Sequence, residues 1–376
     1  MNYTESLFNY KRRETSTTTI GNIAMGSQAV IRIQSMANTN TNDISTSVEQ
    51  CVRIIEAGAD LVRFTTQGTR EAENLGVINK QLKQQNRTAP LVADVHFNPN
   101  VADIAAQKVE KVRINPGNYV DNIHTFQHFE YTDEEYATEI EKIRQRFIPF
   151  LNICKANNTA IRIGVNHGSL SDRIMSRYGD TAQGMVESCM EFLRICCEEE
   201  FYNVVISIKS SNTLAMVQTV RLLVATMQKE NMKFPLHIGV TEAGDGEDGR
   251  IKSAVGIGTL LLDGIGDTLR VSLTEAPENE IPVAKKLVAL LTERQAEPNI
   301  AEQVNEKFSP YEYTRRTTNN VNNIGSKHVP IVVADFSNKE NLTAIEADFV
   351  YSGNKFFETK LPQIVDESIF DNQPNT

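Results

Sequence analysis

A cationic side chain interrupts the apolar pattern of a short β-branched segment. In KVRINP, residues 111–116, Arg113 lies between Val112 and Ile114, and Asn115 follows. Successive side chains of a strand point to opposite faces, so the two apolar residues share one face and the arginine lies on the other. A buried cation without a partner is costly, so this face must meet an anion.

The same alternation recurs in six segments, each of which places one cation opposite its apolar face. These cations are Arg32, Arg63, Arg113, Arg162, Lys209 and Arg270. A single strand arginine is more often half of a structural ion pair, so the prediction depends on the repetition. Guanidinium groups bind phosphate oxygens with paired hydrogen bonds. We therefore expect these cations to form a polyanion site.

Other polar residues share this face or directly follow the strands. They are Asp94, His96, Asn115, Asn166, His167, Ser207, Thr241, Glu242 and Ser272. Asp94 and Glu242 cannot neutralise six cations. Glu242 is a candidate general acid or base, or alternatively an ion-pair partner of one arginine. His96 and His167 follow strand ends, which favours a functional interpretation for both.

Eight β-branched segments bounded by turn residues must position these side chains. They cover residues 30–35, 61–66, 91–97, 111–116, 160–166, 203–210, 236–244 and 268–274. Helical patterns lie between most of them. This alternation predicts an α/β fold, a (β/α)8 TIM barrel, rather than an open doubly wound sheet. In such a barrel the apolar faces meet the helices, and the site lies at the C-terminal mouth.

Two connections are expected to contribute to the mouth. The segment that follows the fourth strand contains an extra loop before its helix. The Gly-rich stretch after the seventh strand lacks the spacing of a phosphate-binding Walker loop or of a calcium-binding loop. It leads toward a helix expected near Ile251 and Lys252, where backbone N–H groups could hold a phosphate.

The composition shifts after residue 295, and this indicates several parts. We expect an N-terminal lead over 1–29, the barrel over 30–295, a polar, Asn-rich linker over 296–329, and the beginning of a second α/β domain over 330–376. The strand-like segments 330–336 and 349–353 support the last assignment. So short a piece is marginal as an independent core, so we expect the chain to be truncated within this domain.

The overall composition excludes several classes of protein. The 376 residues carry a net charge of −10, which disfavours binding to nucleic acid or to an anionic membrane surface. No apolar stretch is long enough to span a membrane, and the N-terminus lacks a secretory signal. The five cysteines show no paired framework and no metal-ligand spacing. We therefore expect a cytoplasmic protein with no metal site in this chain.

Several long motifs, in order, resemble the 4-hydroxy-3-methylbut-2-enyl diphosphate synthase family of the methylerythritol phosphate pathway of isoprenoid biosynthesis. The resemblance covers about residues 20–280. The motifs are QSMANTNTND, LVADVHF, KVRINPGN, IRIGVNHGSL, LHIGVTEAG and GIGTLLLDGIGDTLRVSLT.

The resemblance implies an iron–sulfur oxidoreductase whose barrel binds 2-C-methyl-D-erythritol 2,4-cyclodiphosphate. A [4Fe–4S] cluster in a separate C-terminal domain, held by three Cys and a Glu, would open the ring with electrons from ferredoxin or flavodoxin, giving 4-hydroxy-3-methylbut-2-enyl diphosphate. The implied catalytic residues are Glu242, the proton-transfer group, and His96, which with Thr241 would lie near the substrate carbons. The positions that match diphosphate-binding residues are Arg63, Arg113, Arg162, Asn166, Lys209, Arg270 and Ser272.

The sequence departs from the family in one respect, since the cluster-binding cysteines are missing. The segment after residue 330 resembles the start of the middle domain of the three-domain form of the family. We therefore expect this chain alone to bind the substrate without turning it over. Two alternatives stay open: a dihydropteroate-synthase-like transferase, which needs no cluster, and a non-catalytic phosphate-binding scaffold. The sequence does not fix the oligomeric state, and a homodimer is one state that it allows.

Overall fold

The computed structural model places the chain in two compact units, one up to residue 312 and one from residue 313 onward. It describes residues 3–121, 131–295, 300–301, 309, 311, 314–341 and 345–370. Residues 122–130, which form most of the loop expected over the mouth, lie outside the described residues. Among the described residues, no helix is long and apolar enough to cross a membrane.

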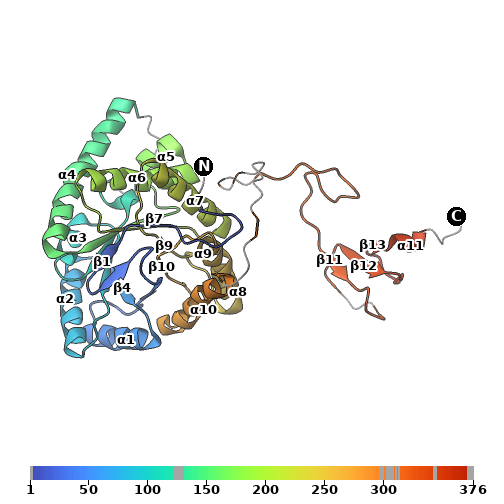
Figure 1. The fold of residues 1–376 in the computed structure, drawn as a ribbon, viewed down its shortest axis with the longest axis horizontal. Coiled ribbons are helices and arrows are strands. Elements are labelled where there is room, and N and C mark those ends of the chain that lie inside the picture. The colour runs from blue at the N-terminus through green and yellow to red at the C-terminus, as the bar shows by residue number, and fades with distance from the viewer. Residues whose placement is uncertain are drawn as a thin grey trace. The chain divides into compact units, whose positions relative to one another are not determined.

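Eight parallel strands form the central sheet of the first unit (Figure 1). They are β3 (Arg32–Met36), β4 (Leu61–Thr66), β5 (Leu91–Val95), β6 (Lys111–Ile114), β7 (Ala160–Asn166), β8 (Val204–Lys209), β9 (His237–Ile238) and β10 (Thr268–Leu269). Their order is β8-β7-β6-β5-β4-β3-β10-β9, and a parallel bridge from Ile206 to Leu236 joins the two ends. The predicted TIM barrel is therefore confirmed.

The last two barrel strands are much shorter than the sequence indicated. Segments 236–244 and 268–274 were expected to be strands, but β9 and β10 each have only two residues. Beyond β9 the backbone enters the left-handed region at Glu242 (φ 49°) and Gly244 (φ 112°), which a regular strand does not accommodate. Single hydrogen bonds still link the two segments, such as Ala243 N–H to the carbonyl of Ser272.

Helices surround the sheet and cover its outer face (Figure 1). They are α1 (Ile44–Ala57), α2 (Thr69–Gln84), α3 (Pro99–Ala105), a short 3₁₀ turn (Pro116–Asn118), α4 (Asp133–Asn157), α5 (Asp172–Tyr178), α6 (Ala182–Glu198), α7 (Thr213–Lys229), α8 (Gly246–Ser253), a π-helical turn (Ala254–Gly258), α9 (Thr259–Leu262) and α10 (Pro277–Gln295). α1 ends at Gly58 in the left-handed conformation (φ 102°), where glycine lacks the Cβ that would clash.

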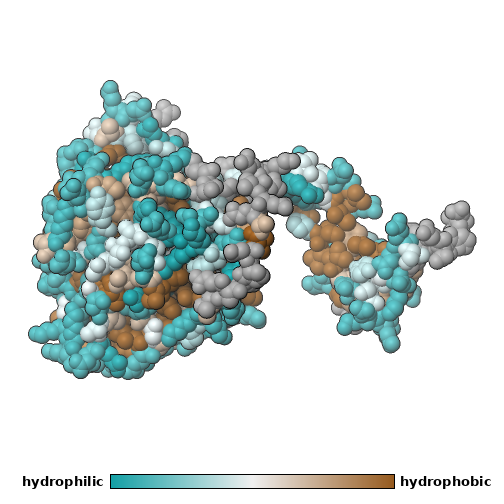
Figure 2. All heavy atoms as spheres, viewed as in Figure 1, coloured by the Kyte–Doolittle hydropathy of each residue, from teal (hydrophilic) through white to brown (hydrophobic). Residues whose placement is uncertain are grey.

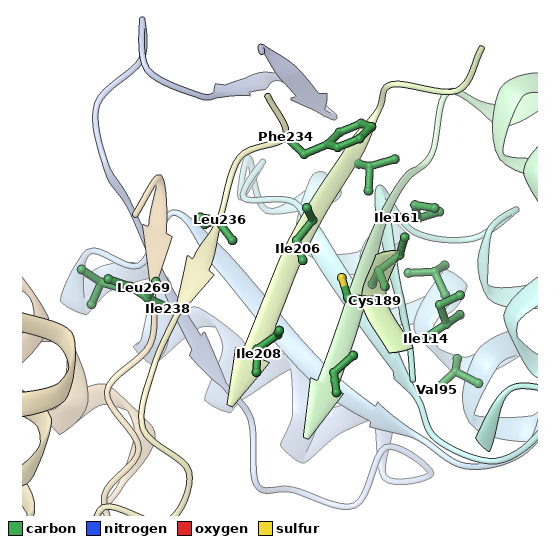
Figure 3. Close-up of a cluster of buried hydrophobic side chains, with 14 of the residues drawn as sticks. Val95, Ile114, Ile161, Cys189, Ile206, Ile208, Phe234, Leu236, Ile238 and Leu269 are labelled. Carbon is green, nitrogen blue, oxygen red and sulfur yellow. The ribbon is translucent and has the colours of Figure 1, made fainter. Parts of the chain in front are cut away.

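The apolar strand faces pack against these helices and form the main core. Ile114, Ile161 and Ile206 are fully buried, and Cys189 of α6 lies among them (Figure 3). Each of these isoleucines is one position away from an inward-facing polar residue. The expected alternation, with apolar residues toward the helices and polar residues inside the barrel, is therefore present on β6, β7 and β8.

A hairpin closes the amino-terminal end of the barrel. β1 (Thr18–Ile20) pairs antiparallel with β2 (Ile23–Met25), within the segment interpreted as an N-terminal lead. Ile20 and Met25 are completely buried. Their apolar cluster also contains Leu61, Val92, Ala160 and Val205, which are the lowest inward side chains of four strands. The barrel interior is therefore sealed with apolar groups at this end.

The second unit contains a three-stranded parallel sheet in the order β11-β12-β13. Its strands are β11 (Val333–Asp335), β12 (Phe349–Gly353) and β13 (Gln363–Val365), followed by α11 (Glu367–Phe370). The first two lie within the segments 330–336 and 349–353 that the sequence indicated as strands. Hydrophobic side chains gather on the surface of this unit (Figure 2). Val329 and Phe356 are two of its exposed apolar residues.

Candidate active site at the barrel mouth

A cavity of about 210 Å³ lies at the carboxyl ends of the barrel strands. It brings together all of the predicted site residues except Arg32, Asn115 and His167. Its lining consists of Arg63, Asp94, His96, Arg113, Arg162, Asn166, Ser207, Lys209, Val240, Thr241, Glu242, Arg270 and Ser272. Residues from seven different strands and their following loops therefore converge on one small volume.

A larger hollow of about 860 Å³ lies near the opposite end of the barrel. Its charged groups neutralise one another or neighbouring residues, since Lys83 lies 2.8 Å from Glu110 and Lys108 lies 2.8 Å from Glu73. The smaller cavity differs because its cations outnumber its anions. Charge, rather than size, therefore identifies the mouth cavity as the candidate site.

Asp94 is the anionic centre of the mouth cavity. Its carboxylate lies 3.2 Å from Arg113, 3.4 Å from Arg63 and 3.9 Å from Arg162. His96 Nε2 also lies 3.2 Å from this carboxylate. Burial alone would raise the pKa of Asp94, but Arg63, Arg113 and His96 hold it well below its ordinary value. Asp94 is therefore ionised and holds several cations in place.

The remaining positive charge exceeds what Asp94 can neutralise. Arg162 is 2% exposed, and its Nε and NH1 atoms have no hydrogen-bond partner among the described residues. Burial, together with neighbouring arginines, lowers the pKa of Arg162 and of Lys209 well below their ordinary values. For the same reasons the pKa of Arg63 falls to about 10. An anion entering the cavity would relieve this mutual repulsion.

Arg270 is held by a carboxylate from outside the barrel strands. Its NH2 atom lies 3.2 Å from Oε1 of Glu280 on α10, which also accepts a hydrogen bond from the Leu273 N–H. Met36 lies between Arg270 and Arg63, and its sulfur accepts hydrogen bonds from both. Glu280 and Met36 therefore orient two guanidinium groups, and sequence reasoning had assigned neither residue to the site.

Two inward-facing glycines make room for the cations. A Cβ at Gly164 would lie 2.6 Å from Nε of Arg113, whose NH2 donates a hydrogen bond to the Gly164 carbonyl. A Cβ at Gly239 would lie 2.7 Å from the carbonyl oxygen of Arg270 and 3.1 Å from Nζ of Lys209. Any larger residue at either position would have to displace a cationic side chain or its backbone neighbour.

Glu242 lies at the rim of the cavity and is exposed to solvent. Its backbone has φ 49°, a left-handed conformation that is unfavourable for a residue with a Cβ. Backbone hydrogen bonds hold both neighbours, from the Thr241 N–H to Ser210 and from the Ala243 N–H to Ser272. This fixed turn holds Glu242 at the mouth, next to Thr241.

Three residues of the sequence analysis do not join the cavity lining. Arg32 begins β3 at the amino-terminal end and lies 3.1 Å from Asp60, so the prediction that it joins the anion site is wrong. His167 lies 3.2 Å from Asp180 and is half exposed. Asn115 donates to the hydroxyl of Ser169 and accepts from the Gly117 N–H, so it shapes the turn after β6.

The Gly-rich loop after β9 does not provide the expected phosphate site. Its helix, α8, begins at Gly246 rather than near Ile251, and Asp245 caps its first N–H. Glu247 and Asp248 occupy the first turn. The three carboxylates at this helix N-terminus compensate the partial positive charge of the helix dipole, and they would repel a phosphate.

Further polar residues lie deeper inside the barrel, and the sequence analysis assigned none of them to the site. Lys111 is fully buried, and its Nζ atom has no hydrogen-bond partner among the described residues. Gln34 and His237 are each 1% exposed and also have unpartnered polar atoms. The signal was available, because Lys111 precedes Arg113 by two positions and must therefore share its face.

The cysteines of this chain do not fit a [4Fe–4S] cluster. Cys51, Cys154, Cys189 and Cys196 are buried, and Cys197 is partly buried. Burial raises the pKa of Cys51 to about 12 and that of Cys196 well above its ordinary value. A thiolate ligand requires the opposite shift. Within the described ranges, no group of three His, Cys, Asp or Glu side chains is arranged to hold a metal ion.

Comparison with known proteins gives a consistent family. The profile described as GcpE TIM-barrel domain matches residues 15–285. A curated protein of Parabacteroides distasonis, named 4-hydroxy-3-methylbut-2-en-1-yl diphosphate synthase (flavodoxin), is 66% identical over 330 residues, which are 88% of this chain and 54% of that protein. A Bacteroides thetaiotaomicron protein of the same name is 60% identical over 375 residues, 98% of this chain and 61% of that protein.

A plant relative extends this similarity. The Arabidopsis thaliana protein named 4-hydroxy-3-methylbut-2-en-1-yl diphosphate synthase (ferredoxin), chloroplastic, is 50% identical over 314 residues, 84% of this chain and 41% of that protein. The chain thus spans about three fifths or less of the length of these relatives.

Among solved structures, a dihydropteroate synthase from Stenotrophomonas maltophilia matches with a TM-score of 0.48 and 11% identity, covering 76% of this chain and all of that one. At this level the similarity carries no argument about function.

Proposed function

Because the chain belongs to the GcpE TIM-barrel family, we propose that its barrel is the substrate-binding part of a 4-hydroxy-3-methylbut-2-en-1-yl diphosphate synthase. The reaction is the reductive conversion of 2-C-methyl-D-erythritol 2,4-cyclodiphosphate to 4-hydroxy-3-methylbut-2-enyl diphosphate. The observation that carries the proposal is the excess of cations in the mouth cavity, where five cationic side chains meet the two carboxylates of Asp94 and Glu242. Two nitrogen atoms of the buried Arg162 have no hydrogen-bond partner among the described residues.

The cavity has the chemistry that a cyclic diphosphate requires. Each of its two phosphates carries a negative charge near neutral pH, so the ligand is a dianion. Arg113, Arg162 and Arg270 offer planar forks for phosphate oxygens, and Lys209 offers a point charge. Asp94 and Glu280 keep the guanidinium groups in place while the site is empty. The donors are therefore preorganised, which lowers the entropy lost on binding.

The carbon end of the ligand would lie toward the rim. His96, Thr241 and Glu242 line the cavity and follow the carboxyl ends of β5 and β9, so in this proposal they face the carbon atoms. In this arrangement Glu242 holds a proton near the oxygen that leaves the ring, and His96 supports the same region through its contact with Asp94. Ser272 and Asn166 offer further hydrogen bonds to phosphate oxygens between the two ends.

The redox half of the reaction needs groups that this chain does not supply. We propose that flavodoxin or ferredoxin delivers the electrons, as the relatives' names indicate for those proteins. The [4Fe–4S] cluster of the family would take its ligands from outside these residues, since the cysteines here do not fit one. In this proposal the chain alone binds the substrate without reducing it.

A calorimetric titration of the chain with the cyclodiphosphate tests the binding role. Wild type should bind, and Arg162→Ala should bind about 10- to 100-fold more weakly, because each charged hydrogen bond contributes roughly 1.5–3 kcal/mol. Arg32→Ala is the matched control, since Arg32 pairs with Asp60 at the other end of the barrel and should bind as wild type does.

Circular dichroism of each variant confirms that it is folded. Equal affinity in Arg162→Ala would contradict the proposed site. Binding of a pterin diphosphate in place of the cyclodiphosphate would instead favour the transferase alternative.

A further inference from the structure

The strand register orders the inward side chains into layers. On β6, Lys111 lies two residues nearer the closed end of the barrel than Arg113. Its partners in the sheet are Val92 of β5 on one side and Ala160 of β7 on the other. In a barrel of this type, four side chains from alternate strands form each layer. The register places Lys111 level with Leu61 and Val205. This layer lies nearer the closed end of the barrel than the layers that contain the arginines. The layer of Lys111 also contains Thr268, and the layer above it contains Gln34, Val92, Arg162 and His237.

Lys111 is closed off from below by apolar groups. Its layer is sealed by the hairpin cluster of Ile20, Met25 and the lowest strand residues. The side chain is 0% exposed, and Nζ has no hydrogen-bond partner among the described residues. Among the described residues of the barrel interior, polar side chains lie level with this amine, as Thr268 does, or above it, toward the mouth cavity.

The charged groups that face Lys111 are cations. Arg162 of β7 and Arg63 of β4 are its electrostatic neighbours, and His237 of β9 belongs to the same cluster. No carboxylate within the described residues comes within ion-pair distance of Nζ. Asp94 of β5, the nearest anion by register, is already shared by Arg63 and Arg113. The inward-facing residues that the remaining strands contribute to these two layers are uncharged. They are Gln34 of β3, Val205 of β8 and Thr268 of β10.

We propose that Lys111 is a further residue of the anion site, uncharged while the barrel is empty and protonated when the cyclic diphosphate occupies the mouth. The amine takes its proton from solvent through the open mouth and becomes an ammonium, and no covalent bond to carbon or phosphorus changes. This inference rests on the proposed function. It assigns binding-linked proton uptake to a residue below the cavity lining.

Electrostatics gives the direction of this change. Burial, and then Arg162 and Arg63, lower the pKa of Lys111 well below its ordinary value in the empty barrel. A dianion in the mouth adds negative charge at short range in a poorly screened interior, and it also neutralises the two arginines. Both effects favour the ammonium. In the empty barrel Lys111 therefore adds no buried charge. In the occupied barrel its ammonium adds a positive charge beneath the bound dianion.

Calorimetry in two buffers measures the proton directly. The chain is titrated with the cyclodiphosphate at pH 7.5 in HEPES and in Tris, whose ionisation enthalpies differ. Each phosphate of the ligand has one ester bond and one anhydride bond, and its single ionisable oxygen does not titrate near this pH, so any buffer dependence reports on the protein. Wild type should take up close to one proton for each ligand bound. Lys111→Met should lose this uptake and bind roughly tenfold more weakly, equivalent to about one pKa unit of linkage.

Two further variants locate the proton. Lys233→Met removes an exposed lysine that pairs with Glu14, and it should keep the uptake of wild type. His237→Asn should also keep most of it. Loss of the uptake in His237→Asn but not in Lys111→Met would overturn the assignment to Lys111.

The failures of the two proposals are distinguishable. Tight binding with no proton uptake would overturn this inference and leave the proposed function standing, whereas absence of binding would contradict the proposed function. NMR of the chain with ¹³Cε-labelled lysine tests the first half without any ligand. One lysine signal should titrate well below the others and should be missing from Lys111→Met. A Lys111 signal that stays in the ammonium form up to pH 10 would overturn the inference.

Discussion

The NH1 atom of Arg113 lies 3.2 Å from Oδ1 of Asp94, and only 3% and 2% of the two side chains are exposed. This pair answers why an arginine can lie in the middle of a barrel strand. The carboxylate compensates for the desolvation of the guanidinium before any ligand arrives. Asp94 also contacts Arg63, so its charge compensates one arginine on each of the two strands that flank β5.

Replacing Asp94 by Asn should strongly destabilise the fold. The change keeps the shape of the side chain but leaves Arg63 and Arg113 as buried, uncompensated cations, which typically costs about 3–5 kcal/mol. Urea unfolding measures the loss. Asp60→Asn is the matched control, because Asp60 pairs with the partly exposed Arg32. We expect it to lose much less, and equal losses in both variants would contradict a special role for the buried pair.

The stabilisation by Asp94 should depend on pH in a defined direction. Its pKa in the folded chain lies well below the ordinary value of 3.8, because Arg63 and Arg113 favour the ionised form despite its burial. A depressed pKa contributes stability that is complete above the unfolded value and is lost as pH falls below it. The difference in free energy of unfolding between wild type and Asp94→Asn should therefore be constant above about pH 5 and should shrink as pH falls below 3.8. A difference that grows on acidification would contradict this assignment.

Gly164→Ala should weaken anion binding although it adds only a methyl group. The new Cβ would lie 2.6 Å from Nε of Arg113 and would push the guanidinium out of its contact with the Gly164 carbonyl. Overpacking of this kind destabilises a fold by about 1–3 kcal/mol. We expect roughly tenfold weaker binding of the cyclodiphosphate in calorimetry, consistent with the loss of one well-placed charged hydrogen bond.

Gly258→Ala is the control for that substitution. Apart from its chain neighbours and its own helix backbone, no atom of the described residues lies within 4 Å of a Cβ at this position, and the backbone is helical there. Alanine should therefore stabilise the chain by about 0.5–1 kcal/mol and leave anion binding unchanged. Unchanged binding in Gly164→Ala would mean that Arg113 relaxes at no cost, and the close approach of the two residues would then have no function.

The sequence predicted the barrel and most of the mouth because both depend on short-range periodicity. A period of two places Arg113, Arg162 and Lys209 on the inner faces of their strands, whatever the rest of the fold does. The same rule does not show how far along the barrel axis each inward side chain lies. Arg32 obeys the period but begins its strand, so it lies at the wrong end and pairs with Asp60. Position along the axis depends on the register between strands, which one sequence does not reveal.

Residues that reach the site from outside the strand pattern were also not predictable. Glu280 is one of many acidic residues on a helix, and only the packing of α10 against β3 brings it to Arg270. The hairpin that seals the barrel lies in a segment with few apolar residues, so its burial follows from the shape of the open barrel end. Lys111, in contrast, was within reach of the periodicity argument and was overlooked.

The cysteines should differ sharply in reactivity. Burial raises the pKa of Cys51 to about 12, and Cys154, Cys189 and Cys196 are equally shielded. Only Cys197 is partly buried rather than buried. A thiol-reactive dye should therefore modify one of the five cysteines in the native chain and all five after denaturation. Cys197→Ser should abolish the native reaction, and rapid modification of a second thiol would show that the helix layer around α6 opens.

Glu242 has an unfavourable left-handed backbone and lies at the rim of the cavity. Substitutions separate the energetic cost of this backbone from the effect of the carboxylate on ligand binding. At φ 49° a residue with a Cβ is strained by roughly 1–2 kcal/mol, whereas glycine is not. Glu242→Gly should therefore be about 1 kcal/mol more stable than Glu242→Ala in urea unfolding, the reverse of the order expected at the helical Gly258. Both variants remove the rim carboxylate, so both should bind the cyclodiphosphate at least as tightly as wild type. If the alanine variant were the more stable one, the left-handed turn would not be strained in solution, and the backbone would no longer explain how the carboxylate is held at the mouth.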